Sequence, residues 1–172
     1  VLWESFGTDV QPAKGDLVEA VIFQKGKIYF KTSSVYREGN AVIAAKNASG
    51  TILWSWHIWL TDRPLEQGYK NGFAVLDRDM GATAYDPMDQ TGTIAGFYYQ
   101  WGRKDPIIGP PDTEDENDEI AGTASQSVAS AGWWKKGTDG SWTYNTTIPV
   151  KQAALIPDVV KDPTAFYRST TE

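Results

Sequence analysis

Two aspartates flank an arginine near the middle of the chain, at Asp77, Arg78 and Asp79. Carboxylates two residues apart on an extended segment share one face, with Arg78 pointing away from them, and such a pair suits a cation or acid/base chemistry. The alternative is a salt-bridge network that pins a loop, with Arg78 and Arg103 as bidentate partners of Asp77, Asp79 or Asp105. We favour the network, and we therefore predict structural roles for Asp77, Arg78 and Arg103.

The densest run of charge in the chain is acidic. Its carboxylates are Asp112, Glu114, Asp115, Glu116, Asp118 and Glu119. Carboxylates are ligands for calcium, but the run lacks the glycine that an EF-hand loop requires at its sharp turn. A solvated acidic loop is the favoured interpretation. We expect no cofactor, with calcium as the alternative.

Three tryptophans and the only histidine lie within nine residues, at Trp54, Trp56, His57 and Trp59. Aromatic faces of this kind could stack on sugar rings, but an uncharged alternating strand favours core packing. Alternation divides the strand into one face with Leu53, Ser55, His57 and Trp59, and a second, uniformly apolar face with Ile52, Trp54, Trp56, Ile58 and Leu60. We predict that the second face meets the core, that His57 is satisfied by one hydrogen bond, and that all four residues are structural.

A second group of aromatic residues lies among glycines and polar residues, where burial is harder to achieve. These residues are Trp101, Trp133, Trp134, Trp142 and Tyr144. Contact with a ligand or partner and local packing are about equally supported for the last four. We take all five as the candidate ligand-binding residues.

Composition excludes several classes of function. The chain has 172 residues and a net charge of −6, so it lacks the basic surface of a nucleic-acid-binding protein. It has no run of about 20 apolar residues that would insert into a membrane. With no cysteine and one histidine, disulfides, thiolate or multi-histidine metal sites and cysteine nucleophiles are excluded. Phosphate-binding loops and dinucleotide fingerprints are also missing.

The local patterns predict a mainly β fold of the α+β class, with antiparallel hairpins and long, irregular, aromatic-rich loops. The expected hairpins pair residues 17–23 with 27–32, 40–46 with 51–60, and 133–134 with 142–144. Residues 1–6 resemble an edge strand, residues 73–76 a short strand, and residues 150–160 a helical segment interrupted by Pro157. The length fits a single domain over 1–172, with 1–36 as a separate N-terminal β-hairpin subdomain in an alternative division.

Four segments carry a family resemblance. Residues 38–46 and 52–59 resemble a signature of fimbrillin-like surface proteins of Bacteroidales. Residues 76–83 are similar to that family's "MDRNLGAT" and residues 96–106 to its "GLYYQWGRKDPF". Residues 161–166 resemble "KNPTTF", and the order and spacing agree over most of the chain. The chain departs from these motifs at Asp79, where Asn is usual, and at Ile107, where Phe is usual.

The resemblance extends to the major paralogous domain of gut and rumen bacteria and so implies a C-type-lectin-like fold. It implies a cell-surface or secreted location, anchored at the outer membrane in a precursor of which this chain is a fragment. The expected function is non-enzymatic: adhesion, carbohydrate or protein binding, or a role in appendage structure, with assembly beside other subunits. One alternative is a glycoside hydrolase-like enzyme that uses Asp77 or Asp79 with a carboxylate of the acidic run. Another is a purely structural assembly subunit.

Overall fold

The computed structural model describes residues 1–6, 11, 13, 15–62, 65–86, 88, 96–99, 103–107, 125–127, 133–137, 139–145, 147–152 and 155–168. The elements are β1 (Trp3–Ser5), β2 (Val18–Gln24), β3 (Lys27–Thr32), β4 (Gly39–Lys46), β5 (Ile52–Leu60), β6 (Glu66–Gly68), β7 (Ala74–Leu76), β8 (Tyr98–Tyr99), β9 (Pro106–Ile107), β10 (Ser125–Ser127), β11 (Trp133–Lys136), β12 (Trp142–Asn145), β13 (Thr147–Gln152), α1 (Ile156–Val160) and β14 (Phe166–Arg168). The predicted mainly β class with antiparallel hairpins is confirmed. No helix of these ranges is long and apolar enough to cross a membrane.

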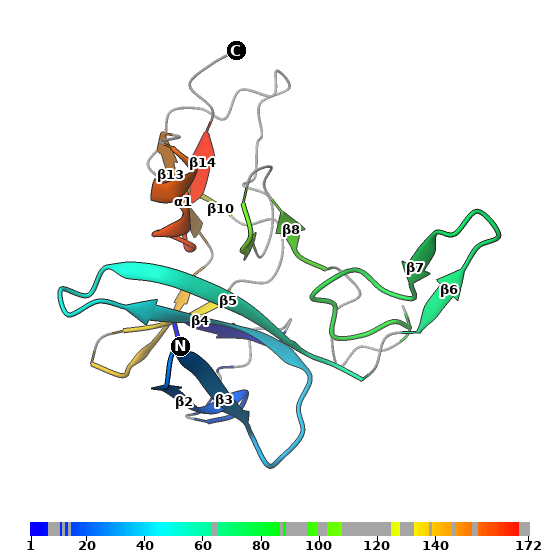
Figure 1. Ribbon diagram of the computed structural model, residues 1–172, viewed down its shortest axis with the longest axis horizontal. Coiled ribbons are helices and arrows are strands. Elements are labelled where there is room, and N and C mark those ends of the chain that lie inside the picture. Colours follow the sequence, from blue (N-terminus) through cyan, green and yellow to red (C-terminus); the bar gives the residue numbers. More distant parts are fainter. Residues whose placement is uncertain are drawn as a thin grey trace.

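A five-stranded antiparallel sheet in the order β12-β11-β1-β4-β5 forms the centre of the fold (Figure 1). In its register, Trp3 lies opposite both Val42 of β4 and Lys135 of β11. Strand β1 is therefore an interior strand, and the prediction of an edge strand was wrong. All three of its residues are buried, because strands cover both of its edges and other segments cover both of its faces. The short alternating segment at residues 3–5 did not reveal how many strands would pair with it.

The hairpin β4–β5 forms as predicted. The turn begins at Asn47, whose side-chain oxygen accepts hydrogen bonds from the backbone N–H groups of Ser49 and Thr51. Gly50 closes the turn with a φ of +83°, which only glycine adopts without cost. The hairpin β2–β3 also forms where it was predicted, around a two-residue turn in which Lys25 and Gly26 both have positive φ.

Apolar side chains cover both faces of the central sheet. On one face Trp3 and Val42 pack with Phe97, which reaches the sheet from a later loop. On the other face Val18 of β2 packs with buried residues of β4 and β5, namely Ala41, Ile43 and Ile58. The hairpin β2–β3 lies on this second side, whereas the C-terminal elements lie across the sheet from it (Figure 1).

Strand β5 departs from strict alternation near its start, where the β4–β5 register shifts between Ala45 and Lys46. At this bulge Leu53 lines the same cavity as Trp56, although alternation had assigned the two residues to opposite faces. The ring of Trp54 lies instead 4.7 Å from Lys104 Nζ, and Trp54 is 45% exposed. The predicted burial of the second face is therefore wrong at Trp54, which is about half exposed beside Lys104.

The remaining elements form small sheets around the central one. Hairpin β6–β7 extends away from the sheet, and its residues are all exposed (Figure 1). Strand β13 pairs with β10 and, in parallel, with β14, while α1 contacts β5. Pro157 lies in the first turn of α1 and so begins that helix, whereas the sequence predicted that it would interrupt one.

Candidate functional site

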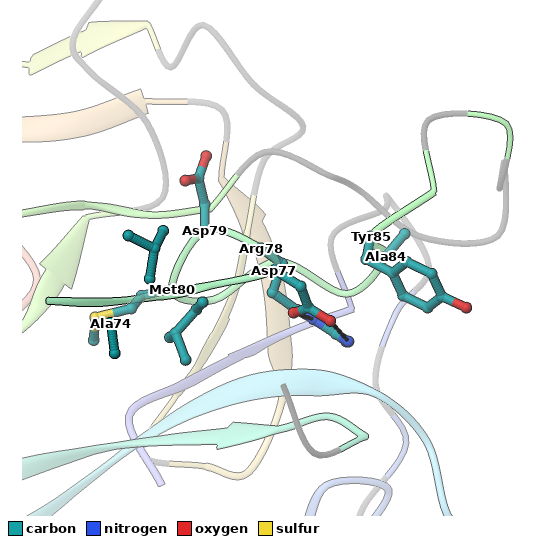
Figure 2. A pocket seen from close by; sticks show the side chains of 9 residues that line it. Ala74, Asp77, Arg78, Asp79, Met80, Ala84 and Tyr85 are labelled. Carbon is teal, nitrogen blue, oxygen red and sulfur yellow. Dashed lines mark hydrogen bonds and ion pairs between the residues drawn. The ribbon is translucent and has the colours of Figure 1, made fainter. Parts of the chain in front are cut away.

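A surface cavity of about 570 Å³ follows strand β7, and Figure 2 shows its lining side chains. The lining comes from residues 74–80 together with Ala84 and Tyr85. The chain enters the loop with a hydrogen bond from Asp77 N–H to Leu65 O and turns where Ala82 N–H bonds to Asp79 O. Gly81 allows this turn with a φ of +94°. The cavity therefore contains the aspartate–arginine segment that the sequence analysis identified.

Asp77 and Arg78 form an ion pair with two hydrogen bonds, at 2.8 Å from Nε to Oδ1 and 3.0 Å from Nη2 to Oδ2. These hydrogen bonds lower the pKa of Asp77. This bidentate pair is the one that the favoured network predicted for Arg78, which bends back along the chain to reach Asp77. Arg78 also donates to Thr61 Oγ1 at 2.9 Å, and its guanidinium lies 5.0 Å from the Tyr85 ring.

Asp79 points away from the Asp77–Arg78 pair in Figure 2, so the two carboxylates do not converge. A general acid needs a raised pKa, whereas the contact with Arg78 lowers that of Asp77. Across the described ranges, no group of three or more carboxylate or histidine side chains could hold a metal ion. This geometry corresponds to the loop-pinning network rather than to a cation site or an acid/base pair.

Two strands of the sheet hold this loop through buried polar contacts. Asn40 of β4 donates from Nδ2 to Gly81 O at 2.8 Å, and Trp59 of β5 donates from Nε1 to Ala82 O at 2.9 Å. Because the Asn40 amide nitrogen is engaged, its Oδ1 accepts the hydrogen bond from His57 Nε2 at 2.9 Å. His57 Nδ1 is then the acceptor for the Tyr99 hydroxyl at 3.4 Å.

Burial lowers the pKa of His57 to about 4, although the negative charge of Asp105 acts in the opposite direction. The imidazole is therefore neutral at pH 7. Both of its nitrogens have partners within the protein, and its ring lies against those of Trp3 and Phe97. His57 thus connects the sheet to the loops above it and presents no free nitrogen to a substrate.

The sequence analysis missed a second polar cluster, at Ser55, Lys104 and Asp105. Asp105 accepts from Ser55 Oγ at 2.9 Å and from Lys104 Nζ at 2.7 Å, and Lys104 also donates to Ser55 O. Ser55 and Asp105 are 1% and 2% exposed, so a substrate cannot reach the hydroxyl. The available signal was Ser55 itself, the one small polar residue among the tryptophans, which needs a buried partner.

Arg103 does not pair with an aspartate side chain in the way that was predicted. Its guanidinium donates to the backbone oxygens of Ala165 and Asp162, and it thereby ties the 103–107 segment to the C-terminal strand β14. Burial lowers its pKa from the usual arginine value. Asp105, the expected partner, binds Lys104 instead.

Three of the candidate ligand residues lie on one face of the ribbon β11–β12. The register pairs Trp134 with Tyr144, and these cross-strand partners point to the same side, as does Trp142, two residues from Tyr144 on β12. The rings of Trp134 and Tyr144 are 5.0 Å apart at an angle of 48°. Trp134 and Trp142 are partly exposed, and Tyr144 is 36% exposed. The ribbon lies at an edge of the central sheet, so we call this face the aromatic ribbon face.

The structure does not place the other two candidate ligand residues, Trp101 and Trp133, on the aromatic ribbon face. Trp101 and the acidic run at residues 112–119 lie outside the described residues. The backbone of Trp133 lies in β11 opposite Asn145, and its side chain lies outside the described residues. The structure therefore brings together Trp134, Trp142 and Tyr144 from the predicted set.

Comparisons with protein-family models, with curated proteins and with solved structures found no match to this chain.

Proposed function

We propose that this chain is a non-enzymatic binding domain of a bacterial cell surface, and that it recognises carbohydrate through the aromatic ribbon face. The observation that carries the proposal is the shared orientation of Trp134, Trp142 and Tyr144 on an edge ribbon, with the rings partly open to solvent. Pyranose rings have apolar faces that stack on aromatic side chains, and an edge ribbon leaves room for an extended glycan. The resemblance to fimbrillin-like and C-type-lectin-like domains supports an adhesive role at the surface.

The enzymatic alternative receives less support. A carboxylate-based glycosidase needs one carboxyl group of raised pKa opposite a second one. Asp77 has a lowered pKa beside Arg78, and His57 and Ser55 are both held inside the fold. Among the described residues, Arg78 (beside Asp77), His57 and Ser55 instead hold loops onto the sheet.

Binding to an array of bacterial and host glycans, followed by calorimetry on any positive sugar, tests the proposal. Trp142→Ala and Tyr144→Ala should each weaken binding at least tenfold, because each removes a stacking ring. Thr143→Ala is the matched control, since Thr143 pairs with Lys135 on the other side of the same strand. Absence of binding at millimolar sugar by a chain with an intact circular dichroism spectrum would refute the carbohydrate proposal.

The surface location has its own test. Intact cells of the source organism would be treated with a protease and probed with an antibody against this chain. Loss of the signal from unbroken cells is expected of a surface domain. Protection of the chain until the cells are lysed would contradict the proposed location while leaving the sugar measurements unaffected.

A further inference from the structure

A second concave surface, separate from the aromatic ribbon face, lies between hairpin β2–β3 and the turn end of hairpin β4–β5. It has a volume of about 860 Å³, within the range of sites that hold peptide side chains or small ligands. Its apolar lining comes from Val21, Phe23 and Ile28 on one hairpin and from Leu53 and Trp56 on the other. We call this surface the hairpin groove. It shares no lining residue with the aromatic ribbon face.

The hairpin groove exposes more apolar surface than a structural role requires. Phe23 is 70% exposed, Leu53 56% and Val21 39%. Clusters of exposed large apolar side chains on a folded domain mark interaction sites more often than chance. Leu53 reaches the groove only because of the bulge in β5, so the departure from alternation itself builds the site.

The charge around the groove is opposite to that of the whole chain. Lys27 and Lys46 line the groove, and no acidic residue does. From Val18 to Lys46 the sequence contains five basic and two acidic residues, a net charge of +3, whereas the whole chain carries −6. Lys31 is neutralised by Glu19 at 2.7 Å, but the part of the chain that the structure describes contains no carboxylate within ion-pair distance of Lys27 or Lys46.

We propose that the hairpin groove binds a protein segment that combines acidic with aliphatic side chains. Aliphatic side chains of the partner fill the apolar floor, and its carboxylates pair with Lys27 and Lys46 at the rim. The charge selects an acidic partner and steers its approach. The apolar lining favours a peptide over an anionic polysaccharide, because a polysaccharide has no aliphatic side chains to bury. Its concave shape favours a peptide over a flat anionic bilayer.

A fluorescently labelled synthetic peptide with the sequence of residues 107–121 has the required chemistry, with six carboxylates and three isoleucines. Fluorescence anisotropy should show saturable binding of this peptide to the full chain. A peptide in which the six acidic residues are replaced by their amides should bind at least tenfold more weakly, as should one in which the isoleucines are replaced by serine. The proposal is overturned if either change to the peptide leaves the binding affinity unaltered, or if no binding is seen at a millimolar concentration of the protein.

Variants of the protein locate the site. The double variant Lys27→Glu/Lys46→Glu should weaken peptide binding at least tenfold, whereas the control Lys70→Glu/Lys161→Glu makes the same change in net charge outside the groove and should not. Leu53→Ser should weaken binding about tenfold, and Leu65→Ser, which alters an apolar residue 71% exposed outside the groove, should not. Equal effects of site and control variants would contradict the proposed site.

Two further probes separate other partners from a peptide. Heparin and vesicles with anionic lipid would be titrated against the wild type and Leu53→Ser. If either binds more tightly than the peptide, with no effect of Leu53→Ser, the groove is a charge patch and the proposal fails. Trp142→Ala should leave peptide binding unchanged, so this result does not depend on whether the aromatic ribbon face binds carbohydrate.

Discussion

At the scale of single residues, His57 shows how burial decides the chemistry of a side chain. It is the only histidine, and general acid/base catalysis is the role most often assigned to such a residue. In this fold Asn40 fixes its tautomer, the ring is packed between Trp3 and Phe97, and desolvation lowers its pKa to about 4. Its neutral form is therefore part of what keeps the sheet and the loops together.

This pKa predicts a dependence of stability on pH. The folded chain holds His57 neutral down to about pH 4, whereas the unfolded chain protonates it near pH 6.5. The contribution to the free energy of unfolding is complete above about pH 6.5 and is lost as the pH falls towards 4. Its size is about 3 kcal/mol, from the difference between the two pKa values.

Urea denaturation at several pH values between 4 and 7.5 measures this effect. The wild type should lose stability over that interval by about 3 kcal/mol more than His57→Gln, in which the titrating group is gone. Carboxylates titrate in both proteins, so the difference between the two curves isolates the histidine. An NMR titration that gives His57 a pKa near 6.5 in the folded protein would contradict the prediction.

The sequence indicated that these polar residues have partners inside the fold, but it identified a partner only for neighbours such as Asp77 and Arg78. An Asp77–Arg78 network and a hydrogen-bonded His57 followed from residue chemistry, because a buried polar group needs a partner. His57 has two hydrogen bonds, however, where one was predicted. The identity of the partner did not follow. Arg103 bonds to the backbone oxygen of Ala165, and no side-chain pattern encodes such an acceptor.

At the scale of elements, the loop above the sheet depends on Gly81. Its φ of +94° is one that other residues rarely adopt, and a Cβ there would come within 2.6 Å of the Phe97 ring. Met80 O also accepts the N–H of Phe97 at 2.8 Å, so the two segments are locked side by side. Gly50 has a similar φ of +83° but nothing within 4 Å of the position of a Cβ.

Alanine substitutions at these two glycines separate two costs to stability: the conformational cost of a positive φ and the steric cost of an added Cβ. Gly50→Ala should lower the free energy of unfolding by about 1 kcal/mol, the cost of a left-handed residue alone. Gly81→Ala should lower it by about 3 kcal/mol, because overpacking against Phe97 is added to the same conformational cost. Thermal or urea denaturation of both variants gives the comparison. Equal losses would show that Phe97 moves freely away from Gly81.

The elements that the sequence predicted well are those with local signals. Hairpins β2–β3, β4–β5 and β11–β12 each have a turn sequence between their strands, and all three form where they were expected. The bulge at Leu53 has no such signal, because it depends on how β4 and β5 are paired. Strand β1 was placed at an edge for a similar reason, since its neighbours come from distant parts of the sequence.

At the scale of the whole molecule, stability should be distributed unevenly. Strand β1 is fully buried between β4 and β11, whereas every residue of hairpin β6–β7 is exposed. Amide protons of β1 and β4 should therefore exchange only when the whole chain unfolds, and those of β6–β7 should exchange by local opening. Hydrogen exchange read by NMR or mass spectrometry checks this. Rapid exchange in β1 would mean that the first strand detaches on its own.

The position of β1 also determines the order in which its pairings with β4 and β11 can form during synthesis. Within this stretch β1 is synthesised before β4 and long before β11, so β4 can pair with it early, whereas Trp3 and Glu4 meet Lys135 and Trp134 only after residues 133–136 have been made. Until then one edge of β1 has no partner from the sheet, and such edges recruit other chains. A nascent or truncated chain that ends before β11 therefore exposes an unpaired strand edge that can pair with other chains, and β11 covers this edge in the finished domain.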